Sequence, residues 1–215
     1  MQKPDRQPQA AADFSVTKRA RLLRSTTIYD GRVVRLKVDR VIEPGGVKAT
    51  REVVCHRGSV VVLPRLDDGR VLLVRQFRYA TGKSLWELVA GGIEPGEAPA
   101  AAARRELLEE TGYRARTLRP LFHFYASPGF LSERMFLFEA RGLSGSKAQP
   151  ERDERIRLGR FTLAGLRTML RNNKIEDGKT LVGLLWLLGS GPAASRLTRQ
   201  PAAASEKSKR EREGP

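Results

Sequence analysis

The sequence predicts an α/β fold in which helices pack on a mixed β-sheet, with a small antiparallel β-sheet before it. Three observations support this prediction. Short strand-like segments fill the first half of the chain, one helix-forming stretch interrupts them near residue 100, and helical segments follow from residue 161. Because each sheet face and each helix stripe must bury its apolar side against another layer, this order favours a mixed sheet covered by helices.

An alternating segment predicts the N-terminal sheet. Residues 33–41 place apolar side chains between charged ones, and residues 43–46 (Glu-Pro-Gly-Gly) form a turn. Residues 48–54 then supply the partner strand. This pattern is typical of an antiparallel pair joined by a short connection.

Apolar runs predict the strands of the main sheet. Residues 59–63 and 71–74 are joined across an Asp-Asp-Gly turn, and both are apolar enough for buried strands. The remaining expected strands are residues 86–89, 121–125 and 135–139.

Three segments predict helices. Residues 99–110 are rich in Ala, Leu, Arg and Glu, which are strong helix formers. Pro99 suits the first turn, and Gly112 suits the left-handed conformation just after the helix end. Residues 161–171 predict an amphipathic helix, and residues 179–188 a more buried one.

Charge and composition divide the chain. The formal net charge is +16, of which residues 1–24 carry +4 and residues 191–215 carry +3, leaving +9 for residues 25–190. A basic body suits an anionic ligand such as a phosphate ester or nucleic acid, although a generally basic surface explains the charge equally well. The polar ends cannot bury enough apolar surface to offset their ordering entropy. We therefore expect a weakly ordered basic tail at 1–24, an N-terminal β subdomain at 25–57, the main domain at 58–190 and a disordered tail at 191–215.

Cysteine content and hydropathy predict a cytoplasmic protein that does not cross a membrane. Cys55 is the single cysteine, so no intrachain disulfide can form, which fits a reducing compartment. The first 24 residues lack the apolar run of a signal peptide. The longest strongly apolar stretch, residues 181–188, is shorter than the roughly 20 residues that span a bilayer.

The most informative stretch contains several carboxylates on one predicted helix. With about 100° per residue, Glu106 and Glu110 lie one turn apart at the border of the apolar stripe, and Glu109 falls farther round. Like charges at this spacing repel, so their position beside a buried face costs stability unless a cation compensates. Mg²⁺ prefers carboxylate oxygens and shares its shell with water and substrate phosphates. Arg105 can pair with Glu97 and hold the preceding loop against the helix. The alternative is an exposed acidic helix with ordinary Arg–Glu ion pairs.

The complete pattern favours the metal site. The stretch fits G-x5-E-x7-R-E-U-x-E-E-x-G-U, where U is a bulky apolar or aromatic residue. Every fixed position is met, by Gly91, Glu97, Arg105, Glu106, Leu107, Glu109, Glu110, Gly112 and Tyr113. This pattern is the Nudix box, so the chain resembles Nudix hydrolases. The resemblance implies an α/β/α sandwich and metal-dependent hydrolysis of a nucleoside diphosphate linked to another moiety.

Segments outside the box resemble the ADP-ribose pyrophosphatase subfamily. They are Val74–Ala80, Leu85–Gly91, Ser127–Phe130 with Glu133, the stretch 51–58 and the stretch 177–180, so the likeness covers roughly residues 25–190. Pro128, 15 residues beyond the box, is the subfamily's distinguishing mark, whereas Val89 departs from it because members often have proline there. This resemblance implies hydrolysis of ADP-ribose, or a related nucleoside diphosphate sugar, to AMP and a sugar phosphate such as ribose 5-phosphate.

The resemblance also assigns roles to individual residues. The metal is Mg²⁺, with Mn²⁺ as a substitute, and its implied ligands are Glu106, Glu110, an assisting Glu109 and the Ala90 carbonyl. The implied catalytic group comprises Glu133 as general base, Glu109 and Arg105. The implied substrate contacts are Arg75, Arg78, Tyr29, Glu87 and Pro128. Gly91, Glu97 and Gly112 have structural roles in the Nudix loop and helix.

Some of these residues have plainer interpretations. Arg75 and Arg78 suit surface arginines of a basic protein as well as phosphate ligands, and Glu133 suits a solvated loop carboxylate. Trp86 alternates with Leu88 and is interpreted as core, not as a platform for adenine. The subfamily implies a homodimer in which N-terminal strands, including Tyr29, cross to the partner.

Two alternative functions stay open. One is a Nudix hydrolase for another sugar nucleotide, such as GDP-mannose, or for an oxidised nucleotide. The other is a non-catalytic, RNA-binding or regulatory Nudix protein, which the net charge favours and the intact box disfavours. We therefore expect a small nucleotide sugar, and not nucleic acid, as the ligand.

Overall fold

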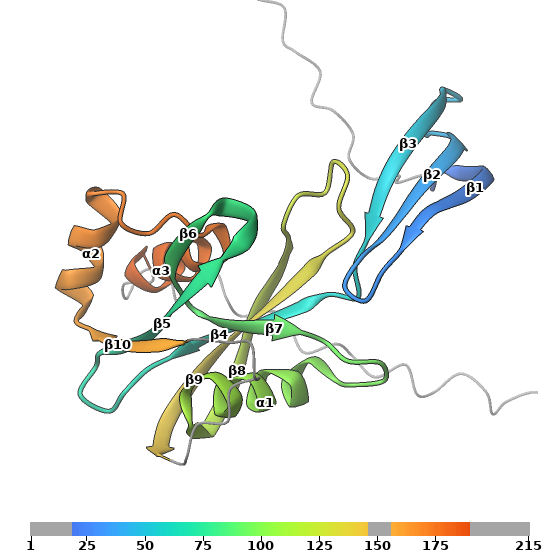
Figure 1. Cartoon of the computed structure of the whole chain (residues 1–215). Helices are drawn as coiled ribbons and strands as arrows, with labels where there is room; N and C mark the ends of the chain where they lie inside the picture. Colours follow the sequence, from blue (N-terminus) through green and yellow to red (C-terminus); the bar gives the residue numbers. More distant parts are fainter. Residues whose placement is uncertain (1–18, 146–155, 190–215) are drawn as a thin grey trace, which may run out of the picture. The chain divides into compact units, whose positions relative to one another are not determined.

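The computed structural model describes residues 19–145 and 156–189 (Figure 1). The predicted tails at 1–24 and 191–215 thus lie outside the described residues, except for residues 19–24. Residues 19–56 and 127–132 form one compact unit, and the other described residues form a second. Within the described residues, none of the helices has the length and apolar character needed to cross a bilayer.

The first unit contains an antiparallel sheet with the order β1-β2-β3. Its strands are β1 (Arg21–Asp30), β2 (Arg35–Ile42) and β3 (Lys48–Cys55), so the two strands predicted here are β2 and β3. β1 was not predicted, because it is exposed along its whole length and pairs with β2 through the backbone without an apolar alternation. It starts at Arg21, so its first residues overlap the segment 1–24 that the sequence predicts as a tail.

A short loop far along the chain also belongs to the first unit. The Val54 N–H donates to the Phe130 carbonyl (2.8 Å), and the Ser132 N–H donates to the Val54 carbonyl (2.9 Å). Residues 127–132 lie within the predicted domain 58–190 in sequence, but they belong to the first unit. They pair with β3 at the edge of the first sheet. The sequence did not predict this pairing, because the loop has no strand-like pattern of its own.

The second unit contains two sheets and three helices. The strands are β4 (Ser59–Pro64), β5 (Val71–Arg78), β6 (Lys83–Glu87), β7 (Val89–Gly92), β8 (Tyr113–Tyr125), β9 (Arg134–Gly145) and β10 (Arg157–Phe161). The helices are α1 (Pro99–Thr111), α2 (Leu163–Arg171) and α3 (Gly178–Gly189), and the short 3-10 turn η1 spans Tyr79–Thr81. One sheet has the order β7-β4-β9-β8 and is mixed because β4 and β9 are parallel; the other, β10-β5-β6, is antiparallel.

The two faces of β4 explain the layers. Val60 and Val62 pack on one side with Leu107 of α1, whereas Val61 and Leu63 pack on the other with side chains of α2 and α3. A strand buried on both faces reads as a continuous apolar run, which is what the sequence contains at 59–63. The predicted α/β/α arrangement with a mixed sheet is therefore confirmed (Figure 1).

Among the element boundaries that differ from the prediction, two have local reasons. The expected strand 86–89 is the junction of β6 and β7, which belong to different sheets, and the N–H of Leu88 between them bonds the Thr180 hydroxyl (2.7 Å). The helix expected from residue 161 starts at Leu163, because the Thr162 hydroxyl caps it by accepting from the Gly165 N–H (3.1 Å).

Candidate active site

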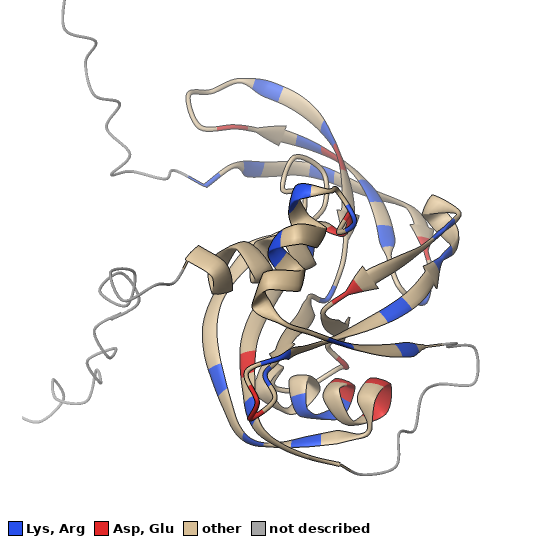
Figure 2. Cartoon of the chain, turned by 90° about the vertical axis from the view of Figure 1, so that its left-hand side faces the viewer, with Lys and Arg blue, Asp and Glu red and all other residues tan. Residues whose placement is uncertain are grey.

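The exposed fractions of the three carboxylates on helix α1 follow the order that the helical periodicity predicts. The side chain of Glu109 is 32% exposed and that of Glu106 12%, and Glu110 as a residue is only 4% exposed. Gly112 ends the helix with φ 70°, and its N–H donates to the Leu108 carbonyl (2.8 Å), as predicted. Near the bottom of Figure 2, α1 carries acidic and basic residues side by side.

The carboxylate of Glu106 lies directly against the backbone of Gly91 in β7. A Cβ atom added at Gly91 would stand 2.0 Å from the carboxyl carbon of Glu106, so no other residue fits this position without moving that carboxylate. The neighbouring Ala90 pairs with Val61 across the β4–β7 ladder, which fixes the strand that carries its carbonyl. Because Gly91 has no side chain, the Glu106 carboxylate of α1 can lie against β7, the strand that carries Ala90, the other predicted ligand.

Arg105 ties the loop before α1 to the helix. Its guanidinium donates two hydrogen bonds to Glu97 (3.0 and 2.9 Å) and one to the Gly92 carbonyl (2.9 Å), which confirms the predicted Arg105–Glu97 pair. It also donates to Glu106 (2.6 Å) and Glu109 (3.1 Å). The hydrogen bonds from Arg105 hold the pKa of Glu97 below its usual value. Because one guanidinium faces three carboxylates, net negative charge remains for a cation.

The groups around α1 offer oxygen donors, the ligand type that a hard divalent cation prefers. Across residues 19–145 and 156–189, no three Asp, Glu, His or Cys side chains are gathered closely enough to hold an ion by themselves. Glu106 and Glu109 both accept hydrogen bonds from Arg105. Mg²⁺ needs only one or two carboxylates beside water and phosphate oxygens, and the predicted ligands Glu106, Glu110 and the Ala90 carbonyl are oxygen donors of this type.

Glu133, the predicted general base, is tied to the same end of the sheet. The Ser59 hydroxyl donates to its carboxylate (2.5 Å), and Ser59 is 7% exposed. Ser59 lies opposite Gly92 of β7 and Met135 of β9, so its partner is held beside the glycines that precede α1. Ser59 is not among the site residues predicted from the sequence; its only local signal is a hydroxyl at the start of an otherwise apolar strand.

The match to a known family agrees with this geometry. Residues 56–181 match the model of the NUDIX domain. The chain belongs to the Nudix family. It is 37% identical to the methanol dehydrogenase activator of Bacillus methanolicus, and this match covers 77% of this chain and 90% of that protein. It is also 37% identical to the ADP-ribose pyrophosphatase of Bacillus subtilis (strain 168), covering 74% and 88% respectively. A solved structure described as an ADP compounds hydrolase has the same fold, with a TM-score of 0.70 and 24% identity over 82% of this chain and 98% of that one. Nudix hydrolases generally use a divalent metal ion.

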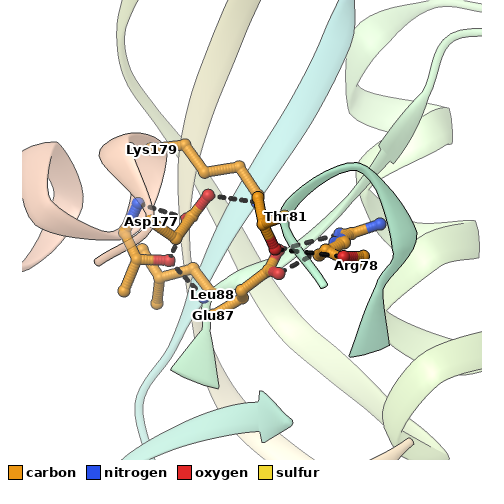
Figure 3. A network of polar contacts seen from close by, with 7 residues as sticks. Arg78, Thr81, Glu87, Leu88, Asp177 and Lys179 are labelled. Carbon is orange, nitrogen blue, oxygen red and sulfur yellow. Dashed lines mark hydrogen bonds and ion pairs between the residues drawn. The ribbon is translucent and has the colours of Figure 1, made fainter. Parts of the chain in front are cut away.

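Two residues predicted to bind substrate in this Nudix chain are paired with each other. Arg78 donates two hydrogen bonds of 2.8 Å to the carboxylate of Glu87 (Figure 3). The hydrogen bond to Glu87 is the largest cause of the raised pKa of Arg78, and the charge of Glu110 also contributes. Arg78 thus interacts with its buried partner Glu87 and, through charge, with Glu110 of α1.

The remaining predicted substrate residues make other contacts or belong to the first unit. Arg75 stands over the ring of Trp86, with 6.0 Å from the guanidinium carbon to the ring centroid. Trp86 packs edge-on against Phe161 (4.9 Å between centroids), which agrees with its interpretation as a core residue. Tyr29 and Pro128 belong to the first unit of the Nudix chain, whereas the carboxylates and arginines belong to the second.

Proposed function

We propose that this Nudix hydrolase cleaves the diphosphate bond of ADP-ribose with Mg²⁺, giving AMP and ribose 5-phosphate. The observation that carries the proposal is the contact of the Glu106 carboxylate with the Gly91 backbone, next to the buried Glu110, because it gathers oxygen donors where a phosphate-bound cation needs them. The likeness to an ADP-ribose pyrophosphatase over 88% of its length supports the substrate.

The proposed metal ligands are Glu106 and Glu110, with Glu109 assisting and the Ala90 carbonyl as a backbone donor; Mn²⁺ is expected to substitute. A bound divalent ion neutralises charge on the diphosphate oxygens and lowers the pKa of a coordinated water. Arg105 positions the carboxylates of Glu106 and Glu109 through its hydrogen bonds. Arg78 and Arg75 are the proposed contacts to the diphosphate or the ribose.

Glu133 is the proposed general base, and Ser59 its positioning residue. Replacing Glu133 with Gln should lower kcat by about 10²-fold, the low end of what a general base contributes, and should change KM little. Replacing Ser59 with Ala should lower kcat less, because the carboxylate stays but loses its 2.5 Å hydrogen bond. Steady-state kinetics measures both effects. A normal kcat for Glu133→Gln would assign the base to another carboxylate.

The first unit is the proposed contact to a second copy of the chain. Apolar side chains on its strands are exposed, with Leu22 at 57%, Ile28 at 58% and Tyr29 at 58%. Burial of these side chains would stabilise a homodimer, in which Tyr29 is a proposed substrate contact. The single Cys55 suits the cytoplasm as the proposed location.

A substrate panel tests the proposed function. Hydrolysis of ADP-ribose, GDP-mannose and 8-oxo-dGTP is compared under the same Mg²⁺ concentration, and the products are identified by mass spectrometry. We expect ADP-ribose among the best substrates, with AMP and ribose 5-phosphate as products. A preference for GDP-mannose or the oxidised nucleotide would show that the proposed substrate is wrong. Salt-dependent RNA binding without any hydrolysis would show that the protein is a binding protein and not an enzyme.

A further inference from the structure

A buried ionic network lies behind Arg78. Glu87 is 1% exposed, and both of its carboxylate oxygens accept hydrogen bonds from Arg78. The Lys179 ammonium at the start of α3 donates to the same carboxylate (Figure 3). Burial alone would raise the pKa of Glu87, but the hydrogen bonds and charges of Arg78 and Lys179 outweigh it and lower that pKa. Glu87 is therefore held as an anion between two cations.

Lys179 is fixed more firmly than Arg78. Its side chain is 10% exposed, against 38% for Arg78. Asp177 accepts a hydrogen bond from the Lys179 ammonium (2.9 Å) and caps α3 by accepting from the Thr180 N–H (2.9 Å) and hydroxyl (2.6 Å). The Thr180 hydroxyl in turn accepts from the N–H of Leu88, the residue after Glu87. The start of α3 thus holds both the backbone and the carboxylate at the end of β6.

Arg78 is the member of the network that reaches outward. It is the most exposed of the network's charged side chains, and the charge of Glu110 acts on it. A guanidinium has more N–H donors than one carboxylate accepts, so Arg78 retains donors for a further anion while Glu87 holds it. A diphosphate bound to a cation at Glu110 is such an anion.

We propose that Lys179 is a positioning residue for diphosphate binding, acting through Glu87 on Arg78. Lys179 shares the negative charge of Glu87, so that this carboxylate orients Arg78 without neutralising it entirely. Without Lys179, the guanidinium becomes the only cation on Glu87 and is held there more tightly, at the expense of substrate. This inference rests on the proposed role of Arg78 as a diphosphate ligand.

The test compares Lys179→Met with Lys179→Arg in the full chain. We expect Lys179→Met to raise KM for ADP-ribose about tenfold, the scale seen for groups that hold a binding residue in place, with kcat changed much less. Lys179→Arg keeps the charge and should restore KM to within about threefold of the wild-type value. A role confined to stability would lower the thermal midpoint of Lys179→Met and leave KM unchanged, which would overturn the proposal.

An exposed ion pair joining β6 to the segment before α3 provides the matched control. Lys83 donates to Glu176 (2.7 Å) with side chains 58% and 42% exposed, so Lys83→Met removes the same charge nearby. We expect KM to stay unchanged in Lys83→Met, because exposed pairs contribute little; an equal rise in KM there would attribute the effect to net charge and also overturn the proposal.

Two further measurements keep the outcome decisive. If Lys179→Met does not fold, Asp177→Asn weakens the hold on Lys179 while preserving a helix cap, and it should also raise KM; an unchanged KM would contradict the proposal. If wild-type protein does not hydrolyse ADP-ribose, the proposed function fails by itself. The variants are then compared on the best substrate of the panel, or by calorimetric Kd for ADP-ribose where nothing is hydrolysed.

Discussion

Replacing Glu110 with Gln should lower kcat by about 10³-fold or more while leaving the fold intact, because it removes a carboxylate charge from the proposed site of a metal that would neutralise the transition state. Glu110 is 4% exposed, so its carboxylate faces the protein and not bulk solvent. Gln has nearly the same shape, so packing around the end of α1 is retained. The change in charge, not in volume, is expected to produce the loss.

Kinetics and thermal unfolding together check this expectation. In wild-type protein, Mg²⁺ should raise the thermal midpoint because it binds the folded state only, and this rise should be smaller in Glu110→Gln. Glu94→Gln is the matched control, since it removes an exposed carboxylate from the loop that precedes the same helix. Near-normal turnover of Glu110→Gln would overturn the metal-ligand assignment, and equal losses in both variants would point to net charge.

The helix and its loop could be predicted closely because their determinants are local. The spacing of Glu106 and Glu110 along one helix fixes their angular position, and the burial of both side chains agrees with it. Arg105 and Glu97 are only 8 residues apart, so their pairing was also within reach of the sequence. When the residues of a motif are close in sequence, the local helix and loop conformation determines their relative positions.

The supporting contacts of the site could not be predicted because they depend on tertiary packing. Ser59 meets Glu133 across 74 residues, and Lys179 meets Glu87 across 92 residues. Ser59 starts an apolar strand and Lys179 lies in the stretch 177–180, but neither local pattern indicates which distant carboxylate the donor reaches. The same reason explains why residues 127–132 belong to the first unit, since they pair with the sequence-distant Val54. β1 pairs with the adjacent β2 and was missed because its sequence has no apolar alternation.

Gly91→Ala should lower activity well beyond about 10²-fold, the loss expected when a reacting group is misplaced by about 1 Å. The new Cβ would stand 2.0 Å from the Glu106 carboxyl carbon, far inside van der Waals contact, so the carboxylate must move away from β7. This movement separates Glu106 from the strand that carries the Ala90 carbonyl. Because a proposed metal ligand is displaced, the Mg²⁺ concentration giving half-maximal activity should also rise.

The adjacent glycine makes this test specific. A Cβ at Gly92 would meet nothing within 4 Å, so Gly92→Ala adds the same methyl group one residue along the same strand without touching Glu106. We expect Gly92→Ala to retain activity within a few-fold of wild type, and both variants to unfold at similar temperatures in EDTA. If Gly91→Ala and Gly92→Ala lose activity equally, the loss reflects strand stiffness; if neither loses it, Glu106 does not need its place against Gly91, and the proposed metal site is wrong in its central contact.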